Sequence, residues 1–141
     1  VDAYAGAGDT AVRLAEAGVR VAAIELDREA TRWAAARLPA GSRAIAGAVE
    51  ERLAEALPAD VVVVNPPRGG LHARVPALLE EAAGGAFGAP PRAVLYVSCN
   101  PATLARDLGR LPSWGVRSIE SYDMFPQTAH VETLCELVPQ S

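Results

Sequence analysis

The sequence predicts an α/β fold with a doubly wound, mostly parallel sheet. Short apolar stretches rich in valine and isoleucine alternate along the chain with amphipathic helical stretches. The run Val61–Val64 is wholly β-branched, which is typical of a strand buried on both faces of a parallel sheet. The last two predicted strands are joined only by residues 123–130, which indicates an antiparallel pair at one sheet edge.

The first half of the chain alternates strands and helices. Residues 1–4 predict the end of a strand that runs into a glycine turn at 5–8. Asp9 and Thr10 can cap the following helix, predicted at 11–17 and ended by Gly18. The other elements predicted here are a strand at 19–25, a helix at 27–38, a weaker strand at 42–46 and a helix at 49–57.

The second half begins with the valine strand. The stretch 65–70 that follows contains two prolines and two glycines, so it can be neither helix nor strand. The later predicted elements are a helix at 76–83, a Gly/Pro-rich loop at 84–91, a strand at 93–98, a helix at 102–111 and strands at 116–122 and 131–138.

The charge of the chain argues against nucleic-acid binding through electrostatics alone. Of the 141 residues, 13 are basic, all of them arginine, and 17 are acidic, so the net charge is −4. The charge is spread evenly over both halves and forms no basic tract. If RNA is the substrate, much of the affinity for its phosphates must come from outside this chain.

Composition also excludes several classes of protein. Two cysteines cannot form a disulfide framework or a four-thiolate metal site, and no cluster has zinc spacing. The apolar runs are far shorter than the ~20 residues that a bilayer crossing requires, and no signal peptide is visible. Without lysine, a Walker-type phosphate loop is impossible. We therefore expect one cytoplasmic domain that holds no metal and has no membrane partner.

Ligands of doubly wound sheets bind beyond the carboxyl ends of the strands, and four unusual motifs fall at such ends. The first motif is Asp2-x-Tyr4-x-Gly6-x-Gly8. Its glycines let the backbone approach a ligand closely. Glu25, at the end of the second strand, can accept hydrogen bonds from both hydroxyls of a ribose. This motif alone leaves NAD open as the ligand.

The second motif, Asn65-Pro66-Pro67-Arg68, directly follows the valine strand. Two prolines fix a stiff, extended loop, which holds the Asn65 amide at a set position. An amide offers donors and an acceptor that suit the edge of a heterocycle. The structural alternative is an ordinary Asn-Pro turn.

The third motif, at residues 98–103, sets Cys99 between a buried strand and a helix. A helix N-terminus favours the thiolate form of a nearby cysteine, so Cys99 is a candidate nucleophile. A cysteine in such a place is, taken alone, more often small core packing. Cys135 lies inside the last strand, and we expect it in the core.

The fourth motif is the polar segment 123–132 between the last two strands. Glu132 begins the last strand, where its carboxylate could remove a proton, although a surface glutamate is the simpler reading. His130 could also act as a base, but a hydrogen bond that anchors the loop is the favoured role.

Four motifs follow one another along the chain in an order that matches a known protein family. They are Asp2-x-Tyr4-x-Gly6-x-Gly8, Asn65-Pro66-Pro67-Arg68-x-Gly70, Tyr96-Val97-Ser98-Cys99-Asn100-Pro101 and Asp123-Met124-Phe125-Pro126-Gln127-Thr128-x-His130-Val131-Glu132. Together they resemble the RNA uracil-5-methyltransferase family, which makes 5-methyluridine in transfer RNA or large-subunit ribosomal RNA. The resemblance implies a Rossmann-like fold with a seven-stranded sheet and S-adenosylmethionine as cofactor.

The resemblance also assigns roles by motif. It implies that Cys99 is the nucleophile and that Glu132 is the general base. The implied cofactor-binding residues are Tyr4, Gly6, Gly8, Asp9, Glu25 and Asn65, and the implied substrate-binding residues are Asn65, Arg68, Asn100 and His130. The family usually has aspartate where this chain has Asn65, so an ionic role at that position is in doubt.

Residues 1–141 are expected to be the family's C-terminal catalytic domain alone. The preceding β-rich domain, which supplies most of the RNA contacts, is absent from the sequence, and so is the part that carries an iron–sulfur cluster in some members. Three other interpretations stay open: a cofactor-binding fragment without productive RNA binding, an amino-group nucleic-acid methyltransferase, and a nicotinamide oxidoreductase. An amino-group methyltransferase normally has an aromatic residue where this chain has Arg68. A nicotinamide oxidoreductase does not account for Cys99 and Glu132.

Overall fold

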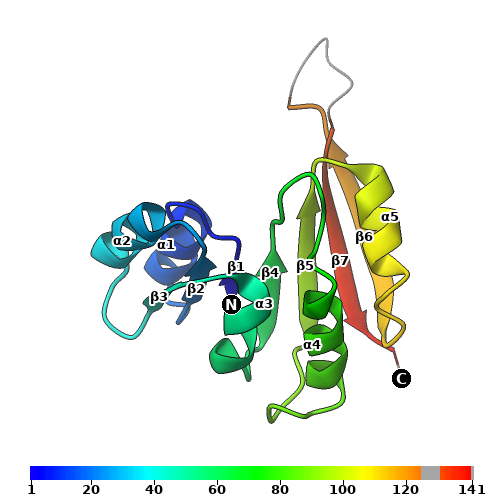
Figure 1. Ribbon diagram of the computed structural model, residues 1–141, viewed down its shortest axis with the longest axis horizontal. Helices are drawn as coiled ribbons and strands as arrows, with labels where there is room; N and C mark the ends of the chain where they lie inside the picture. Colours follow the sequence, from blue (N-terminus) through cyan, green and yellow to red (C-terminus); the bar gives the residue numbers. More distant parts are fainter. Residues whose placement is uncertain (125–130, 141) are drawn as a thin grey trace. The chain divides into compact units, whose positions relative to one another are not determined.

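The computed structural model describes residues 1–124 and 131–140, which form two compact units, Val1–Leu57 and Pro58–Ser141 (Figure 1). The first unit has three parallel strands in the order β3-β2-β1. Its elements are β1 (Asp2–Ala3), α1 (Asp9–Glu16), β2 (Ala22–Glu25), α2 (Arg28–Arg37), β3 (Arg43–Ala46), α3 (Val49–Arg52) and the 3₁₀ helix η1 (Leu53–Ala56).

Small side chains fill the core of the first unit. Ala11 and Ala15 of α1 are buried together with Val21 and Ala23, and Ala3 and Ile24 have no exposed surface. Alanine at these positions lets a helix lie close to the strands. The packing brings the N-terminus of α1 near the carboxyl ends of β1 and β2.

Three boundaries of the first unit differ from the sequence prediction. Helix α1 begins at Asp9 with Gly8 as its N-cap, so the predicted side-chain cap by Asp9 or Thr10 is wrong. Strand β2 starts three residues later than predicted, because Val19 N–H still bonds to the Leu14 carbonyl at the end of α1. The helix predicted at 49–57 is divided into α3 and η1.

The second unit has four strands in the order β4-β5-β7-β6. Its elements are β4 (Val61–Val64), α4 (Arg74–Ala83), β5 (Ala93–Ser98), α5 (Pro101–Leu108), β6 (Trp114–Tyr122) and β7 (Glu132–Pro139). β4 and β5 are parallel, and β7 runs antiparallel to both of its neighbours. Figure 1 shows the long strands β6 and β7, in orange and red, side by side.

These observations confirm the predicted fold class. The described residues contain seven strands, and the pairs within β1–β5 that each unit forms are parallel. The antiparallel strand is β7, one position in from the edge strand β6. Val62, Val64, Val94 and Tyr96 have no exposed surface, so β4 and β5 form the core of the second unit.

Candidate functional site

The glycine motif forms a tight turn after β1. Ala5 N–H donates to the Ile24 carbonyl at 3.0 Å, and Gly8 N–H closes the turn onto the Ala5 carbonyl at 2.9 Å. Gly6 and Gly8 have φ values of 55° and 84°, in the left-handed region. Tyr4, with φ 63°, adopts the same region although it carries a side chain. Such backbone strain is concentrated at functional sites in proteins.

The two glycines of the turn differ in what surrounds them. A Cβ at Gly8 would lie 2.7 Å from Ala34 Cβ, so α2 requires glycine there. A Cβ at Gly6 would meet no atom of the described residues within 4 Å, so packing does not require glycine there. The space beside Gly6 is thus open for a ligand to approach the backbone.

Alanine at these two positions is expected to have opposite effects. Gly8→Ala should destabilise the fold by about 2–4 kcal/mol, because left-handed strain and overlap with Ala34 add up. Gly6→Ala should cost only roughly 1–2 kcal/mol of strain, yet its methyl group would stand where a ligand approaches. Urea unfolding and calorimetric titration with S-adenosylhomocysteine measure the two effects. If Gly6→Ala and Gly8→Ala lost equal free energy of unfolding and equal affinity for S-adenosylhomocysteine, the proposed difference between the two glycines would be wrong.

Glu25 lies at the end of β2 and holds the turn. Its Oε2 accepts from Gly6 N–H and its Oε1 from Asp27 N–H, both at 2.8 Å. A carboxylate offers about four acceptor positions, so about two remain for the hydroxyls of a ribose.

Asp9 forms an ion pair with Arg37 at 2.7 Å, and Arg37 also donates to the Ala7 carbonyl.

Asp2 is buried in β1 directly before the turn. Its Oδ2 has no hydrogen-bond partner among the described residues. Burial raises the pKa of Asp2 from 3.8 to about 6, against the opposing effect of a hydrogen bond with the Ala11 backbone. The folded chain therefore holds a proton that the unfolded chain releases at lower pH.

This difference predicts a stability that falls between about pH 4 and pH 6. There the folded state binds more protons than the unfolded state, so the free energy of unfolding decreases as the pH rises and levels off above the folded pKa. Asp2→Asn removes this pH dependence. Its free energy of unfolding relative to the wild type should increase by roughly 2.4 kcal/mol from pH 4 to pH 7. Urea unfolding across this range measures it, and a pH-independent difference would contradict the account.

The second unit carries the other predicted residues at the carboxyl ends of β4 and β5. Asn65 and Arg68 are exposed on the loop directly after β4, and Pro66 between them is buried and anchors the loop. Because Val64 of β4 pairs with Tyr96 of β5, this loop and the turn after Ser98 leave the same end of the two strands.

The β5–β7 register places Cys99 and Glu132 at the same end of this strand pair. Ser98, the last residue of β5, pairs with Thr133 of β7. Cys99 is the next residue after Ser98, and Glu132 directly precedes Thr133, begins β7 and pairs with Tyr122 on its other side. Both residues are half-buried, so each retains solvent access. A thiol and a carboxylate, the groups that nucleophilic addition and proton removal require, thus lie at the same end of these two strands.

The other cysteine cannot compete for the role of nucleophile. Cys135 lies in the middle of β7 with no exposed surface, as predicted for a core residue. Burial raises the pKa of its thiol, which disfavours the thiolate.

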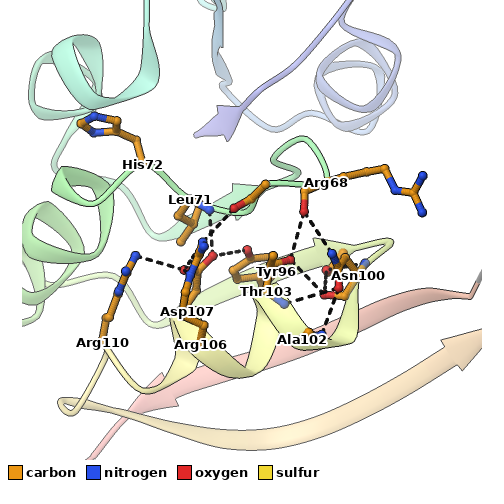
Figure 2. Close-up of polar contacts among 12 residues, drawn as sticks. Arg68, Leu71, His72, Tyr96, Asn100, Ala102, Thr103, Arg106, Asp107 and Arg110 are labelled. Atoms are coloured by element: carbon orange, nitrogen blue, oxygen red, sulfur yellow. Dashed lines mark hydrogen bonds and ion pairs between the residues drawn. The ribbon is translucent and has the colours of Figure 1, made fainter.

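Asn100 is the N-cap of α5, and its side chain forms hydrogen bonds with backbone groups. Its Oδ1 accepts from Ala102 and Thr103 N–H, and its Nδ2 donates to the Arg68 carbonyl at 3.3 Å (Figure 2). A role in substrate binding stays a prediction beside this capping role. His130 lies outside the described residues.

Sequence reasoning missed three residues that hold the loop after β4: Thr103, Arg106 and Asp107. All three lie on α5, at three- and four-residue spacings from Asn100 and Thr103. This spacing puts them on one helix face, which is the signal that could have revealed them. Nothing in the sequence marks Asp107 as fully buried.

The described residues show neither a membrane-spanning helix nor a metal-binding cluster. Residues 1–124 and 131–140 contain no helix with the length and apolar character for crossing a bilayer. The same part of the chain has no group of three or more His, Cys, Asp or Glu side chains that could hold a metal ion.

Comparison with known proteins gives consistent matches. The sequence profile described as tRNA (uracil-5-)-methyltransferase matches residues 51–138. An uncharacterised RNA methyltransferase of Gloeobacter violaceus is 43% identical over 97% of this chain and 30% of its own length. The 23S rRNA (uracil(747)-C(5))-methyltransferase of Vibrio vulnificus is 35% identical over 99% of this chain and 36% of its own. The chain thus spans about a third of these relatives.

Solved structures agree with the sequence relatives. The Pyrococcus abyssi tRNA (uracil-54, C5)-methyltransferase in complex with S-adenosylhomocysteine is 31% identical, with a TM-score of 0.82 over 97% of this chain and 33% of that one. The Synechocystis magnesium protoporphyrin IX methyltransferase shares the fold, with a TM-score of 0.67 at 15% identity over 99% of this chain and 68% of that one. The profile match covers more than half of the chain, and this chain therefore belongs to the tRNA (uracil-5-)-methyltransferase family.

Proposed function

We propose that this chain is the catalytic domain of an enzyme that transfers a methyl group from S-adenosylmethionine to carbon 5 of a uridine in RNA. The observation that carries the proposal is the register of β5 and β7, in which Ser98 pairs with Thr133, so that their neighbours Cys99 and Glu132 lie at the same end of the two strands. Family membership and the Pyrococcus abyssi enzyme, which acts on uracil 54 of tRNA, support this chemistry.

The residues of the first unit fit an adenosine-containing cofactor. The open space beside Gly6 admits a ligand against the backbone, and Glu25 keeps acceptor positions for ribose hydroxyls. Tyr4, Gly8, Asp9 and Asn65 complete the proposed set. The bound cofactor would supply a methyl group on a positively charged sulfonium, which is strongly activated for transfer.

Cys99 opens the proposed reaction. Carbon 5 of uracil is too weak a nucleophile to accept a methyl group directly. When the Cys99 thiolate adds to carbon 6, the ring electrons shift onto the carbonyl oxygen at carbon 4, and the resulting enolate is nucleophilic at carbon 5. Arg68 and Asn65 on the stiff loop would orient the base during this step.

Glu132 closes the reaction. After the methyl group has been transferred, carbon 5 carries both the new methyl and its original hydrogen. The Glu132 carboxylate takes this proton, its electron pair re-forms the double bond between carbons 5 and 6, and the bond from carbon 6 to Cys99 breaks. The thiolate is regenerated, and the protonated Glu132 releases its proton to solvent.

The RNA substrate is proposed to bind largely through a domain outside this sequence. The net charge of −4 gives the chain little affinity for phosphates, and its relatives are about three times as long. The named relatives act on transfer RNA or on 23S ribosomal RNA. A uridine in folded RNA must be turned out of its stack to reach Cys99.

The test is a methylation assay with the full gene product, RNA and cofactor carrying a labelled methyl group. The expected product after digestion is 5-methyluridine. A nucleoside methylated on an amino group would instead support the alternative class of nucleic-acid methyltransferase. Calorimetry should show binding of S-adenosylhomocysteine and none of NAD.

A second candidate function is cofactor binding without productive RNA binding by the 141 residues alone. The acidic net charge favours this reading for the isolated chain. The same assay on this chain beside the full gene product decides between them. Equal turnover by both would exclude the second candidate.

A further inference from the structure

A buried carboxylate joins three elements of the second unit. Asp107 of α5 has no exposed surface. Its Oδ2 accepts from Leu71 N–H at 2.7 Å and from the Tyr96 hydroxyl at 2.8 Å (Figure 2). Its Oδ1 accepts from Arg106 at 2.8–2.9 Å and from Arg110 at 3.4 Å. The carboxylate thus ties the loop after β4 to β5 and α5.

The same helix face holds the loop at further points. Arg106 donates to the Gly69 carbonyl at 2.8 Å, and Thr103 and Asn100 both donate to the Arg68 carbonyl at 3.3 Å (Figure 2). Consecutive backbone groups of the loop are therefore fixed by side chains of the helix that directly follows Cys99. These bonds set the loop's place relative to the thiol-bearing turn.

Gly70 shows how closely the loop lies on α5. Its φ is 78°, and an added Cβ would overlap Asp107 Oδ2 and lie 2.6 Å from Arg106 Nη2. Only a residue without a side chain permits this approach. The hydrogen bonds and the glycine thus specify one position of the loop.

Charge balance alone does not explain this arrangement. Arg106 and Arg110 lie on the same helix, are exposed to a similar extent, 43% and 42%, and both pair with Asp107. Only Arg106 also bonds to the loop backbone. Pairing with Asp107 does not require this second contact, which adds a direct link between Arg106 and the loop.

We infer that Asp107 and Arg106 are positioning residues, which hold the loop of Asn65 and Arg68 in register with Cys99 for the transfer step. The inference rests on the proposed function. A misplacement of about 1 Å in a reacting geometry can cost about 10²-fold in rate. Loosening the loop should therefore lower kcat more than it weakens cofactor binding, because Asn65 is the one proposed cofactor-binding residue on the loop and the others, such as Gly6 and Glu25, belong to the other compact unit.

The test compares Arg106→Met with Arg110→Met in the full gene product. Arg106→Met should lower kcat for uridine methylation about 10- to 100-fold and raise the KM for the cofactor by a smaller factor, whereas Arg110→Met should stay within about twofold of the wild type in both. Hydrogen exchange of the amides at residues 68–71 should accelerate in Arg106→Met only. If Arg106→Met does not fold, Arg106→Lys keeps the charge but lacks the fork geometry, and it should reduce kcat in the same direction.

Two outcomes would overturn the inference. Equal kcat values for the Arg106 and Arg110 variants, in a wild-type protein that methylates uridine, would overturn it and leave the proposed function standing. Absence of methylation by the wild-type protein would overturn the proposed function and the inference together, so the two failures are distinguishable.

Discussion

Cys99→Ala is expected to abolish methylation of uridine, with a loss on the order of 10⁴-fold or more. Without the thiolate, carbon 5 of uracil has no route to becoming nucleophilic, and removal of a nucleophile costs about this much in other enzymes. The fold should be retained, because Cys99 is only half-buried and carries a small side chain. Turnover with the full gene product and thermal unfolding measure the two effects.

Cys135 provides the matched control. Cys135→Ala also removes one thiol, but from the core of β7, so it should lower stability slightly and leave kcat within about twofold. Full activity of Cys99→Ala would show that the chemistry does not use this sulfur, and the assignment of the nucleophile would be wrong.

Glu132→Gln is expected to stop the reaction at a later point. An amide cannot accept the proton from carbon 5, so turnover should fall about 10²- to 10⁴-fold while addition of Cys99 and methyl transfer still occur. A methylated covalent complex between Cys99 and RNA should therefore accumulate. Denaturing gel electrophoresis with RNA and a labelled methyl group detects such a complex.

Glu136→Gln is the control for this charge change. Glu136 lies on the same strand and pairs with Arg117 at 3.3 Å, away from the end of β5 that bears Cys99. This variant should turn over normally and trap nothing. A Glu132→Gln protein that loses activity without a trapped complex would indicate that Glu132 acts before the thiol adds, and its role as the final base would be wrong.

The sequence predicted the strands and the strand ends at which the candidate functional residues lie. The valine run of β4 and the apolar stretch of β5 are bounded by prolines and polar motifs, so local chemistry alone defines them. Helix and strand boundaries were less predictable. Gly8 caps α1 where Asp9 or Thr10 was expected, because close packing against Ala34 selects glycine there.

The relations between motifs could not be predicted from spacing. That Cys99 and Glu132 lie at the same end of two paired strands depends on the β5–β7 register, which long-range pairing determines. The burial of Asp107 could not be predicted either, because a charged residue in a helix usually faces water. Its hydrogen bonds to Leu71 and Tyr96 exist only once the loop and β5 meet α5.

The covalent bond between the chain and the uracil ring is the claim that can be tested most directly. RNA that carries 5-fluorouridine at the target position should trap the enzyme in the presence of cofactor, because the fluorine on carbon 5 cannot leave as a proton does. Peptide mapping by mass spectrometry is expected to find one methylated fluorouridine attached to Cys99. An enzyme that makes 5-methyluridine but forms no adduct, or forms it at Cys135, would contradict the account.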